Sequence, residues 1–500
     1  MKHSTNDLRF KRLGIDAQHE YFAYMREDCH VCISEGFEAL TRVRLTHGDK
    51  TIIASLNVVR TEILKTGEVS LSESAAQSLE VMEGGMITVS HQHPNDSLGH
   101  VRSKIYGNEL SALQLKEIIQ DIVAGNYSNV HLSAFITACA GNRMNTEEII
   151  ALTEAMIASG KSIRWRDDVV VDKHCIGGLP GNRTTPIIVS IVTALGLTMP
   201  KTSSRAITSP AGTADTMEVM APVALLMSQI EQVVLQEGGC IAWGGTAQLS
   251  PADDILIRIE KALDIDSEGQ LIASVLSKKV AAGSSHVIID MPVGPTAKLR
   301  NTKAAEELQA EMQRVAKAIG LKLKVIITDG SQPIGRGIGP ALEARDILAV
   351  LRNESKAPQD LKERALLLAG EVLELAGTVD KGKGNDKARE VLESGKAYKK
   401  FMAICNAQGG FQEPGMARYQ HKVKAIKKGT VTGVDNRKLA KLAKLAGAPG
   451  DKLSGIDFLC PIGSNVTKGQ TLYVIHADSK GELNYALDYY ITQTDILKIS

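Results

Sequence analysis

The chain has 500 residues, and its proportions of 43% hydrophobic and 23% charged residues are those of a globular protein, not of a fibrous or disordered one. A formal net charge of +1, from 58 Lys and Arg against 57 Asp and Glu, leaves no whole-protein field that would attract nucleic acid or an acidic membrane surface. A chain of this length predicts about three or four folding units.

Neither a membrane protein nor a disulfide-built protein is expected. No apolar run approaches the roughly 20 residues of a membrane helix, and the first residues lack the apolar core of a signal peptide, so a cytoplasmic enzyme is the default expectation. Seven cysteines, an odd number, do not indicate a disulfide framework. Cys29 and Cys32 form a CxxC pair around His30, which we interpret as two half-buried thiols of a strand rather than a zinc or redox site.

Residues 1–95 predict a β-rich N-terminal domain. Apolar and polar residues alternate in neighbouring segments, and turn-forming residues separate these segments, which is typical of β-hairpins. The expected elements are a strand over 39–45, a strand over 51–59, a helix over 72–82 and a strand over 86–89.

The rest of the chain predicts three further domains. They are a helical domain at 100–165 (with part of 212–250), an α/β phosphate-binding domain at 166–425 and an α+β C-terminal domain at 426–500. Apolar residues recur every three or four positions in two helices, over 113–123 and 145–156, and Ser111 caps the first. From Asp168 onward short apolar strands alternate with helices rich in Ala and Leu. The predicted fold class is α/β plus α, in which the helical domain and a mixed α/β sheet domain form a cleft.

The segment from Asp172 to Thr185 carries the most chemical information. An apolar strand enters a glycine-rich turn and an apolar helix follows, so backbone amides at the helix start point at whatever the turn holds. Thr184 and Thr185 add hydroxyl donors, and Lys173 and Arg183 add positive charge. Together they predict a cradle for an oxyanion, which we expect to be phosphate.

A second polar loop follows the next strand, from Lys201 to Glu218. The hydroxyl side chains at 202, 203, 204, 208, 209 and 213 surround Arg205 in it, and a helix is expected to begin near Asp215. This concentration of donors favours anion binding over an ordinary loop with capping serines and a surface arginine.

Common nucleotide-binding and metal motifs do not fit these loops. Asn182 and Arg183 stand where the Walker motif needs Gly-Lys, and Pro340 takes the place of the last glycine of a dinucleotide fingerprint. No set of His, Cys and carboxylate residues has metal-ligand spacing, so no metal and no cofactor is expected, with inorganic phosphate as a co-substrate.

Three motifs resemble those of the thymidine and pyrimidine-nucleoside phosphorylase family. In chain order they are Asp172-Lys-His-Cys-Ile-Gly-Gly178, the run from Ser203 to Glu218, and Ser274-Val-Leu-Ser-Lys-Lys279. The resemblance covers about residue 100 to the end. The β-rich start and the Pro-Gly-Asn insert at 180–182 resemble a long form of the family, AMP phosphorylase, and some bacterial members of this form are named thymidine phosphorylases.

This resemblance implies roles for individual residues. Phosphate contacts are implied for Lys173, Thr184, Thr185, Ser203 and Thr213. Residues that match pyrimidine contacts are His174, Ser274 and Lys278. The AMP-cleaving relatives imply nucleotide contacts at Gly178, Ser204, Arg205, Ala206, Ile207, Thr208, Ser209, Ser274 and Lys298, and a proton donor at Asp266.

Two positions depart from the short enzymes of the family. Those enzymes have an arginine about fifteen residues before the serine, where this chain has Ile259 beside Arg258, and Cys175 replaces a serine that contacts phosphate. The missing arginine and the long form favour a nucleotide as substrate, whereas the retained His174 and Lys278 are compatible with a pyrimidine.

The implied reaction is phosphorolysis of an N-glycosidic bond. The first expectation is thymidine plus phosphate giving thymine and 2-deoxyribose 1-phosphate, and the alternative is cleavage of AMP or another nucleoside 5′-monophosphate to base and ribose 1,5-bisphosphate. His174 or Asp266 would assist the leaving base, although Asp266 could instead cap the helix over 270–280 and His174 could be a structural histidine. A homodimer or larger homo-oligomer is expected from the resemblance.

Two other classes remain as alternatives. An activity like that of anthranilate phosphoribosyltransferase would need Mg²⁺, diphosphate and a carboxylate pair beside the glycine loop, and the sequence has no such pair. A carrier module would need a lysine in the turn of the hairpin at 461–469, where the carrier-type lysine is missing.

Overall fold

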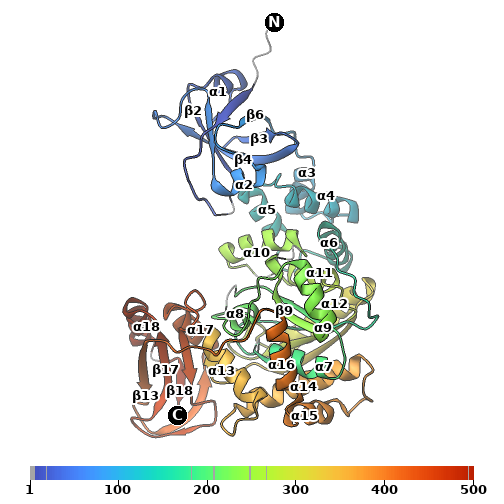
Figure 1. Cartoon of the computed structure of the whole chain (residues 1–500), viewed down its shortest axis with the longest axis vertical. Coiled ribbons are helices and arrows are strands. Elements are labelled where there is room, and N and C mark those ends of the chain that lie inside the picture. Colours follow the sequence, from blue (N-terminus) through green and yellow to red (C-terminus); the bar gives the residue numbers. More distant parts are fainter. Residues whose placement is uncertain are drawn as a thin grey trace. The chain divides into compact units, whose positions relative to one another are not determined.

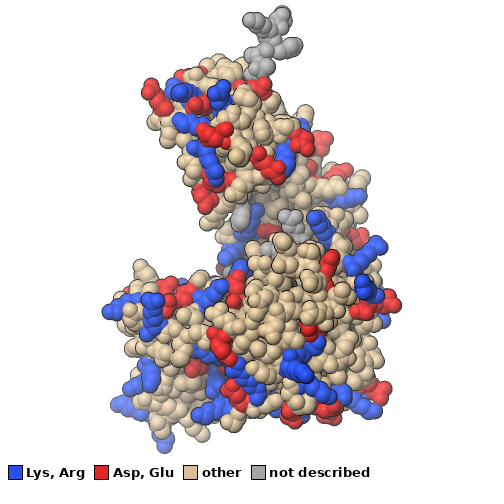
Figure 2. Space-filling view, in the orientation of Figure 1, with Lys and Arg blue, Asp and Glu red and all other residues tan. Residues whose placement is uncertain are grey.

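The computed structural model describes residues 6–500 apart from His19, Asn182, Ile207, Thr208, Ala247, Gln248, Asp266 and Thr494. The chain divides into two compact units, Met1–Tyr106 with Gln120–Phe135 and Gly107–Ile119 with Ile136–Ser500. Among the described residues, no helix is long and apolar enough to cross a membrane. Figure 2 shows Lys and Arg side chains interspersed with Asp and Glu over the visible face.

A closed barrel forms the N-terminal part of the first unit, with the strand order β1-β5-β2-β4-β3-β6 (Figure 1, blue). Its strands are β1 Asp7–Phe10, β2 Phe22–Arg26, β3 Arg42–His47, β4 Lys50–Val59, β5 Glu68–Leu71 and β6 Met86–His91. The predicted hairpin is confirmed, since β3 pairs antiparallel with β4 and its alternating Val43 and Leu45 are fully buried. Helix α2 (Glu73–Leu79) lies within the predicted helix over 72–82.

The CxxC pair lies at the start of a short helix, so its prediction as two half-buried strand thiols is wrong. Cys29 is the N-cap of α1 (His30–Glu35), Cys32 lies in the first turn, and both are buried in the barrel core. A run as short as this does not distinguish a helix from a strand by periodicity.

Helices follow the barrel in sequence. They are α3 Ser97–Ile105, α4 Ala112–Val123, α5 Asn129–Cys139 and α6 Thr146–Ser159. The two helices that hydrophobic spacing predicts are confirmed as α4 and α6. Asn145 caps α6 through a capping box, in which its side chain accepts from the Glu148 N–H and the Glu148 carboxylate accepts from the Asn145 N–H.

Five parallel strands organise the α/β part of the second unit. They are β7 Val171–Cys175, β8 Met199–Ser203, β9 Gly239–Trp243, β10 His286–Val293 and β11 Lys322–Asp329. One sheet has the order β11-β10-β7, a second pairs β8 with β9, and a parallel bridge between Val170 and Thr198 joins them. All described pairings here are parallel, not mixed as predicted, because each connection crosses over through a helix.

Helix α7 (Thr184–Ala194) is the core of this part. It has no polar face, and its residues Thr184 to Thr193 are all buried, as expected for a helix that neighbours surround. The other helices are α8 Thr213–Glu218, α9 Met227–Glu237, α10 Pro251–Leu263, α11 Glu268–Ala281, α12 Thr302–Ala318, α13 Pro340–Leu351, α14 Gln359–Leu375, α15 Gly384–Glu393 and α16 Lys396–Ala407. Packing on all sides fixes the start of α7, where the predicted oxyanion cradle lies.

Residues 419–500, which we call the C-terminal module, form two small sheets and two helices (Figure 1, red). Their elements are β13 Tyr419–Lys424, β14 Gly429–Val434, α17 Asn436–Leu445, β15 Gly455–Phe458, β16 Asn465–Val466, β17 Thr471–Ala477, α18 Lys480–Thr492 and β18 Leu497–Ile499. The sheet β12-β15-β17-β13 includes β12 (Gly337–Ile338), which comes from the α/β part and pairs antiparallel with β15. The module therefore shares a sheet with the loop before α13.

Candidate active site

Two loops leave the carboxyl ends of the neighbouring parallel strands β7 and β8. The glycine loop (residues 176–183) connects β7 to α7, and the serine loop (residues 204–212) connects β8 to α8. Parallel strands end at the same edge of a sheet, so both loops lie at the edge where α/β proteins bind their ligands.

Lys173 is a fully buried cation on β7. Its Nζ donates to Thr184 Oγ1 at 2.9 Å and to the carbonyl oxygen of Gly181 at 3.4 Å. Both partners are neutral, and no described carboxylate pairs with this ammonium group. A buried charge without a counter-charge is costly, so Lys173 favours an anion beside the glycine loop.

Asp172, the neighbouring residue, connects the first motif with the third, and it also pairs with Lys201, two residues before the second motif. Its carboxylate lies 2.7 Å from Lys279 Nζ on α11 and 3.2 Å from Lys201 Nζ on β8, and all three side chains are buried. Burial raises the pKa of Asp172, but the two ammonium groups outweigh burial and hold that pKa below its usual value. Lys201 and Lys279 thus share one carboxylate, which leaves a net positive charge below the Lys279 pKa of about 7.

His174 lies among these cations and stays neutral near pH 7. Burial, followed by the positive charges of Lys279, Lys201, Lys278 and Lys173, lowers the pKa of His174 well below its usual value. The imidazole can therefore donate one N–H and accept at the other nitrogen, but it carries no extra proton.

The glycine loop passes close to other backbone segments. A Cβ on Gly178, where φ is +98°, would lie 3.3 Å from the amide nitrogen of Lys298, so the loop approaches the segment of this predicted nucleotide contact. A Cβ on Gly181 would lie 3.1 Å from Asp290 Oδ2. Burial and then Asp290 raise the pKa of Cys175 to about 12, so this thiol stays protonated.

The two predicted threonines lie at the start of α7, where both are buried. Thr184 Oγ1 accepts from Lys173 and donates to the Gly181 carbonyl oxygen at 2.7 Å, whereas Thr185 is the next residue of the helix. The structure therefore brings Lys173 and both threonines together at the glycine loop.

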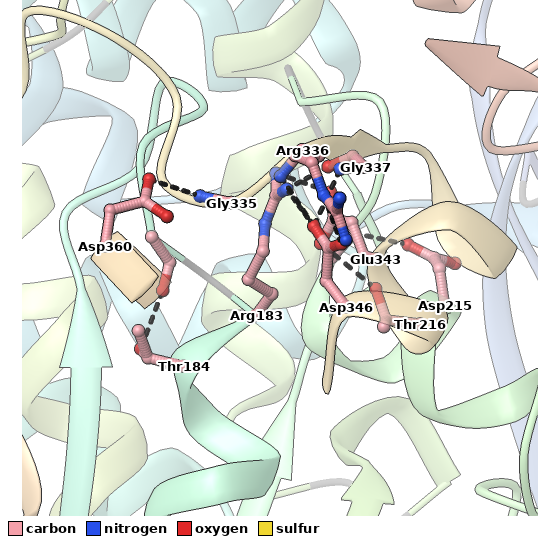
Figure 3. A network of polar contacts seen from close by, with 12 residues as sticks. Arg183, Thr184, Asp215, Thr216, Gly335, Arg336, Gly337, Glu343, Asp346 and Asp360 are labelled. Carbon is pink, nitrogen blue, oxygen red and sulfur yellow. Dashed lines mark hydrogen bonds and ion pairs between the residues drawn. The ribbon is translucent and has the colours of Figure 1, made fainter. Parts of the chain in front are cut away.

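Arg183 does not add its charge to the oxyanion cradle, contrary to the prediction. Its guanidinium group is buried and turned toward α13, where it contacts Glu343 at 3.3 Å and Asp346 at 3.7 Å and donates to the Gly337 carbonyl oxygen (Figure 3). Burial raises the pKa of Glu343 to about 7 despite the opposing charge of Arg183. Arg183 is thus an anchor of the loop.

The serine loop is held closed by a single carboxylate. Asp215 Oδ2 accepts from the backbone N–H groups of Ala206 at 2.6 Å and Gly212 at 2.9 Å, so the Ala206 amide, a predicted nucleotide contact, already has a partner. A Cβ on Gly212 would lie 2.9 Å from the Ala206 nitrogen.

The predicted hydroxyl contacts of this loop differ in exposure. Ser204 is exposed, Ser203 and Ser209 are partly exposed, and Thr213 is buried at the start of α8. Ser203 Oγ donates to the carbonyl oxygen of Ser204 at 3.1 Å. The serine hydroxyls are therefore the accessible donors of the serine loop.

The Arg205 guanidinium group contacts two carboxylates and an aromatic ring, so it does not stand free among the hydroxyl groups of the loop. Its guanidinium donates to both oxygens of Glu218, at 2.7 and 2.8 Å, lies 3.4 Å from Asp215 and stacks 4.8 Å from the ring centroid of Trp243. These contacts explain why no net charge of Arg205 is left for an anion in this arrangement.

Ser274 and Lys278 lie one turn apart on α11 and are both partly exposed. Lys278 Nζ contacts Asp253 on α10 at 2.7 Å. Ile259 and Arg258 also lie on α10, and the Arg258 side chain is exposed. The positive charge of Lys278 is one of the charges that lower the pKa of His174.

Three predicted site residues lie outside the described residues: Ile207, Thr208 and Asp266. Helix α11 begins at Glu268, earlier than the predicted 270, and its N-cap is Ser267. The suggested capping role for Asp266 concerns a residue outside the described part of the chain and stays a prediction. Among the residues that the structure describes, no group of three or more His, Cys, Asp or Glu side chains could hold a metal ion.

Sequence reasoning missed the pairing of Lys201 and Lys279 with Asp172. Lys279 ends the third quoted motif and Lys201 stands two residues before the second, and these positions were the available signal. Glu218 ends the second motif, but the sequence did not indicate that it pairs with Arg205, and Asp290 lies outside the three motifs.

Comparison with known proteins assigns most of the second unit to one family. Residues 100–160 match the glycosyl transferase family, helical bundle domain; residues 167–398 match the glycosyl transferase family, a/b domain; and residues 430–496 match the pyrimidine nucleoside phosphorylase C-terminal domain. The coarse architecture of a helical part, an α/β part and a C-terminal part follows from these matches.

Full-length relatives agree with this assignment. Two proteins named "Putative thymidine phosphorylase", from Polaromonas sp. and from Legionella pneumophila (strain Corby), are each 56% identical over 496 residues, which covers 99% of this chain and 97% and 96% of theirs. A third protein of the same name, from Hahella chejuensis, is 56% identical over 484 residues and covers 97% of this chain.

A solved structure shares the fold. The crystal structure of anthranilate phosphoribosyltransferase from Thermus thermophilus superposes with a TM-score of 0.52 at 20% identity, covering 62% of this chain and 98% of that one. At this identity the likeness concerns the fold alone. The chain therefore belongs to this glycosyl transferase family, in the branch whose bacterial members bear the name thymidine phosphorylase.

Proposed function

We propose that this protein cleaves the N-glycosidic bond of a nucleoside by phosphorolysis and that the glycine and serine loops bind the phosphate. The charge balance around β7 is the observation that carries the proposal. Lys173 is buried with neutral partners only among the described residues, and Lys201 and Lys279 share the one carboxylate of Asp172. A phosphate dianion at the loops would neutralise this excess of positive charge.

The nucleophile would be held beside C1′ of the sugar by donors on the strands and helices that flank the two loops, β7 and α7 on either side of the glycine loop and β8 and α8 on either side of the serine loop. The proposed phosphate contacts are Lys173, Thr184, Thr185, Ser203 and Thr213. Fixing phosphate and nucleoside in reacting geometry can lower the barrier by about 7–11 kcal/mol. The Lys173 side chain is buried beside the glycine loop, so phosphate would reach its ammonium group by a local movement at Gly177 and Gly178, the residues before Leu179.

The leaving base gathers negative charge and needs a proton or a hydrogen-bond donor. Neutral His174 would donate its N–H to the base, and Lys278, oriented by Asp253, would place a positive charge beside it. Ser274, one turn earlier on α11, would hold the base. We assign the proton transfer to Asp266.

Thymidine is the proposed substrate, since relatives with 56% identity over nearly the whole chain bear the name "Putative thymidine phosphorylase". One observation favours AMP or another nucleoside 5′-monophosphate as the alternative. Ile259 stands where the short pyrimidine enzymes have an arginine, and the neighbouring Arg258 side chain is exposed on α10.

Release of free base from thymidine, uridine, AMP and CMP, each with and without inorganic phosphate, tests the function and ranks the substrates. Lys173→Ala should abolish release from every substrate, because it removes the buried cation. Lys303→Ala, at an exposed lysine of α12, is the matched control and should retain wild-type rates. Base release that is independent of phosphate would refute phosphorolysis.

The proposed assembly is a homodimer or a larger homo-oligomer. Sedimentation velocity at micromolar concentration measures it directly, and a species of one chain would contradict this part of the proposal.

A further inference from the structure

The C-terminal module contacts both loops of the candidate site, although it supplies none of the proposed phosphate donors. Three separate sets of contacts connect it to the loops. One is apolar, one is a buried ionic network and one is an ion pair nearer the surface.

Leu179 forms the apolar connection from the middle of the glycine loop. Its φ is +92°, a region that residues with a side chain rarely adopt, and the residue is only 4% exposed. Its side chain belongs to the core of the C-terminal module, together with Val423, Phe458 and Leu472. An unfavourable backbone conformation persists where packing over-determines it, so the module holds this loop in place.

Arg183 forms the ionic connection at the end of the glycine loop. Its guanidinium donates to the carbonyl oxygen of Gly337, the first residue of β12, and β12 pairs with β15 of the module (Figure 3). In addition, the Ile334 N–H donates to the Pro180 carbonyl oxygen at 2.9 Å. The glycine loop therefore rests on a segment that is itself a strand of the module's sheet.

Lys452 forms the third connection, to the serine loop. Its Nζ lies 2.9 Å from Glu218, the carboxylate that also holds Arg205 of the serine loop. The backbone of Lys452 is fixed as well, because its carbonyl oxygen accepts from the Ala341 N–H at 2.9 Å.

We propose that the C-terminal module positions both loops for phosphate binding, with Leu179 and Lys452 as its positioning residues. This proposal rests on the proposed phosphorolysis. Neither residue touches the reacting atoms: Leu179 acts through the glycine loop, and Lys452 acts through Glu218 and Arg205. Loss of either contact releases a loop and lowers phosphate affinity while the chemistry of the bound complex is retained.

Leu179→Gly separates this role from simple backbone strain. Glycine suits a φ of +92°, so the substitution relieves strain while it removes the anchor. If the anchor matters, the KM for phosphate should rise about tenfold, with kcat and the KM for the nucleoside changed by less than about twofold. Leu179→Met, which keeps the volume and the apolar contacts, should restore the KM for phosphate to near its wild-type value.

Controls come from the same module. Leu442→Ala removes a buried leucine of the same core away from the loops, and Lys438→Met removes the ion pair with Asp495. Both should leave the KM for phosphate unchanged, whereas Lys452→Met should raise it about threefold, as expected for loss of one partly exposed pair.

The outcomes distinguish this proposal from the proposed function. If the wild-type protein releases base without phosphate, the proposed phosphorolysis itself is refuted. A wild-type protein with phosphate-dependent release, combined with an unchanged or lower KM for phosphate in Leu179→Gly, overturns the positioning role alone. An equal rise in Leu442→Ala would also overturn it, because the effect would then reflect general loosening of the module.

Discussion

Asp172→Asn is expected to be the most damaging single substitution in the candidate site. The side chain is 1% exposed, and its carboxylate lies 2.7 Å from Lys279 Nζ and 3.2 Å from Lys201 Nζ. Asparagine keeps the shape but removes the negative charge, so Lys201 and, below its pKa of about 7, Lys279 become buried ammonium groups without a carboxylate among the described residues. Removing one partner of a buried ion pair costs about 3–5 kcal/mol.

Differential scanning calorimetry measures this cost. For a unit of this size, each kcal/mol shifts the midpoint by roughly 1.3 °C, so the transition of the second unit should fall by about 4–6 °C. Asp380→Asn, which breaks an exposed pair with Lys383, should shift it by less than about 1 °C. Adding Lys279→Met to Asp172→Asn should recover part of the loss, because one unpaired ammonium group disappears.

A midpoint for Asp172→Asn within about 1 °C of wild type would refute the reasoning, because it would mean that the two ammonium groups are solvated or neutral in the folded chain. A double variant less stable than the single one would refute the charge argument in the same way.

Three further predictions concern other residues of the site. Burial and Lys201 lower the pKa of Lys279 to about 7 from 10.5, so between these pH values the unfolded chain binds a proton that the folded chain does not. The stability of the folded chain should therefore rise from pH 7.5 to pH 9. Thermal midpoints measure this rise, and Lys279→Met should abolish it. The titration midpoint of the His174 imidazole, measured by NMR, should lie well below the ordinary value of about 6.5, and a midpoint near 6.5 would contradict the desolvation and the lysine charges that act on this side chain. Gly212→Ala should lower phosphate-dependent base release at least about tenfold, because the new Cβ would lie 2.9 Å from the Ala206 nitrogen. The circular dichroism spectrum should stay unchanged. Wild-type activity in this variant would show that the serine loop tolerates the clash.

Local sequence patterns predicted the elements of the site well. The apolar strand before Lys173, the glycine turn and the apolar helix from Thr184 follow from composition and spacing within about fifteen residues, and the structure has them as β7, the glycine loop and α7. The same local reasoning found the helices α4 and α6.

Side-chain direction could not be predicted in this way, because it depends on distant partners. The sequence predicts Arg183 as one more cation of the oxyanion cradle, but its guanidinium group pairs with Glu343, which is 160 residues further along the chain. Leu179 looks like an ordinary loop residue, and its proposed role as an anchor depends on a core formed by residues more than 150 positions away. Such long-range pairings leave no periodic signal in a single sequence.

The central claim is that inorganic phosphate, held by the two loops, displaces the nucleobase. Phosphorus-31 NMR of a mixture of the protein, thymidine or AMP, and phosphate tests it most directly. The account predicts that the inorganic phosphate resonance falls while a new sugar 1-phosphate ester resonance grows in step with free base, and that both changes are lost in Lys173→Ala. Free base that accumulates while the inorganic phosphate resonance stays constant would contradict the account, since water would then be the nucleophile.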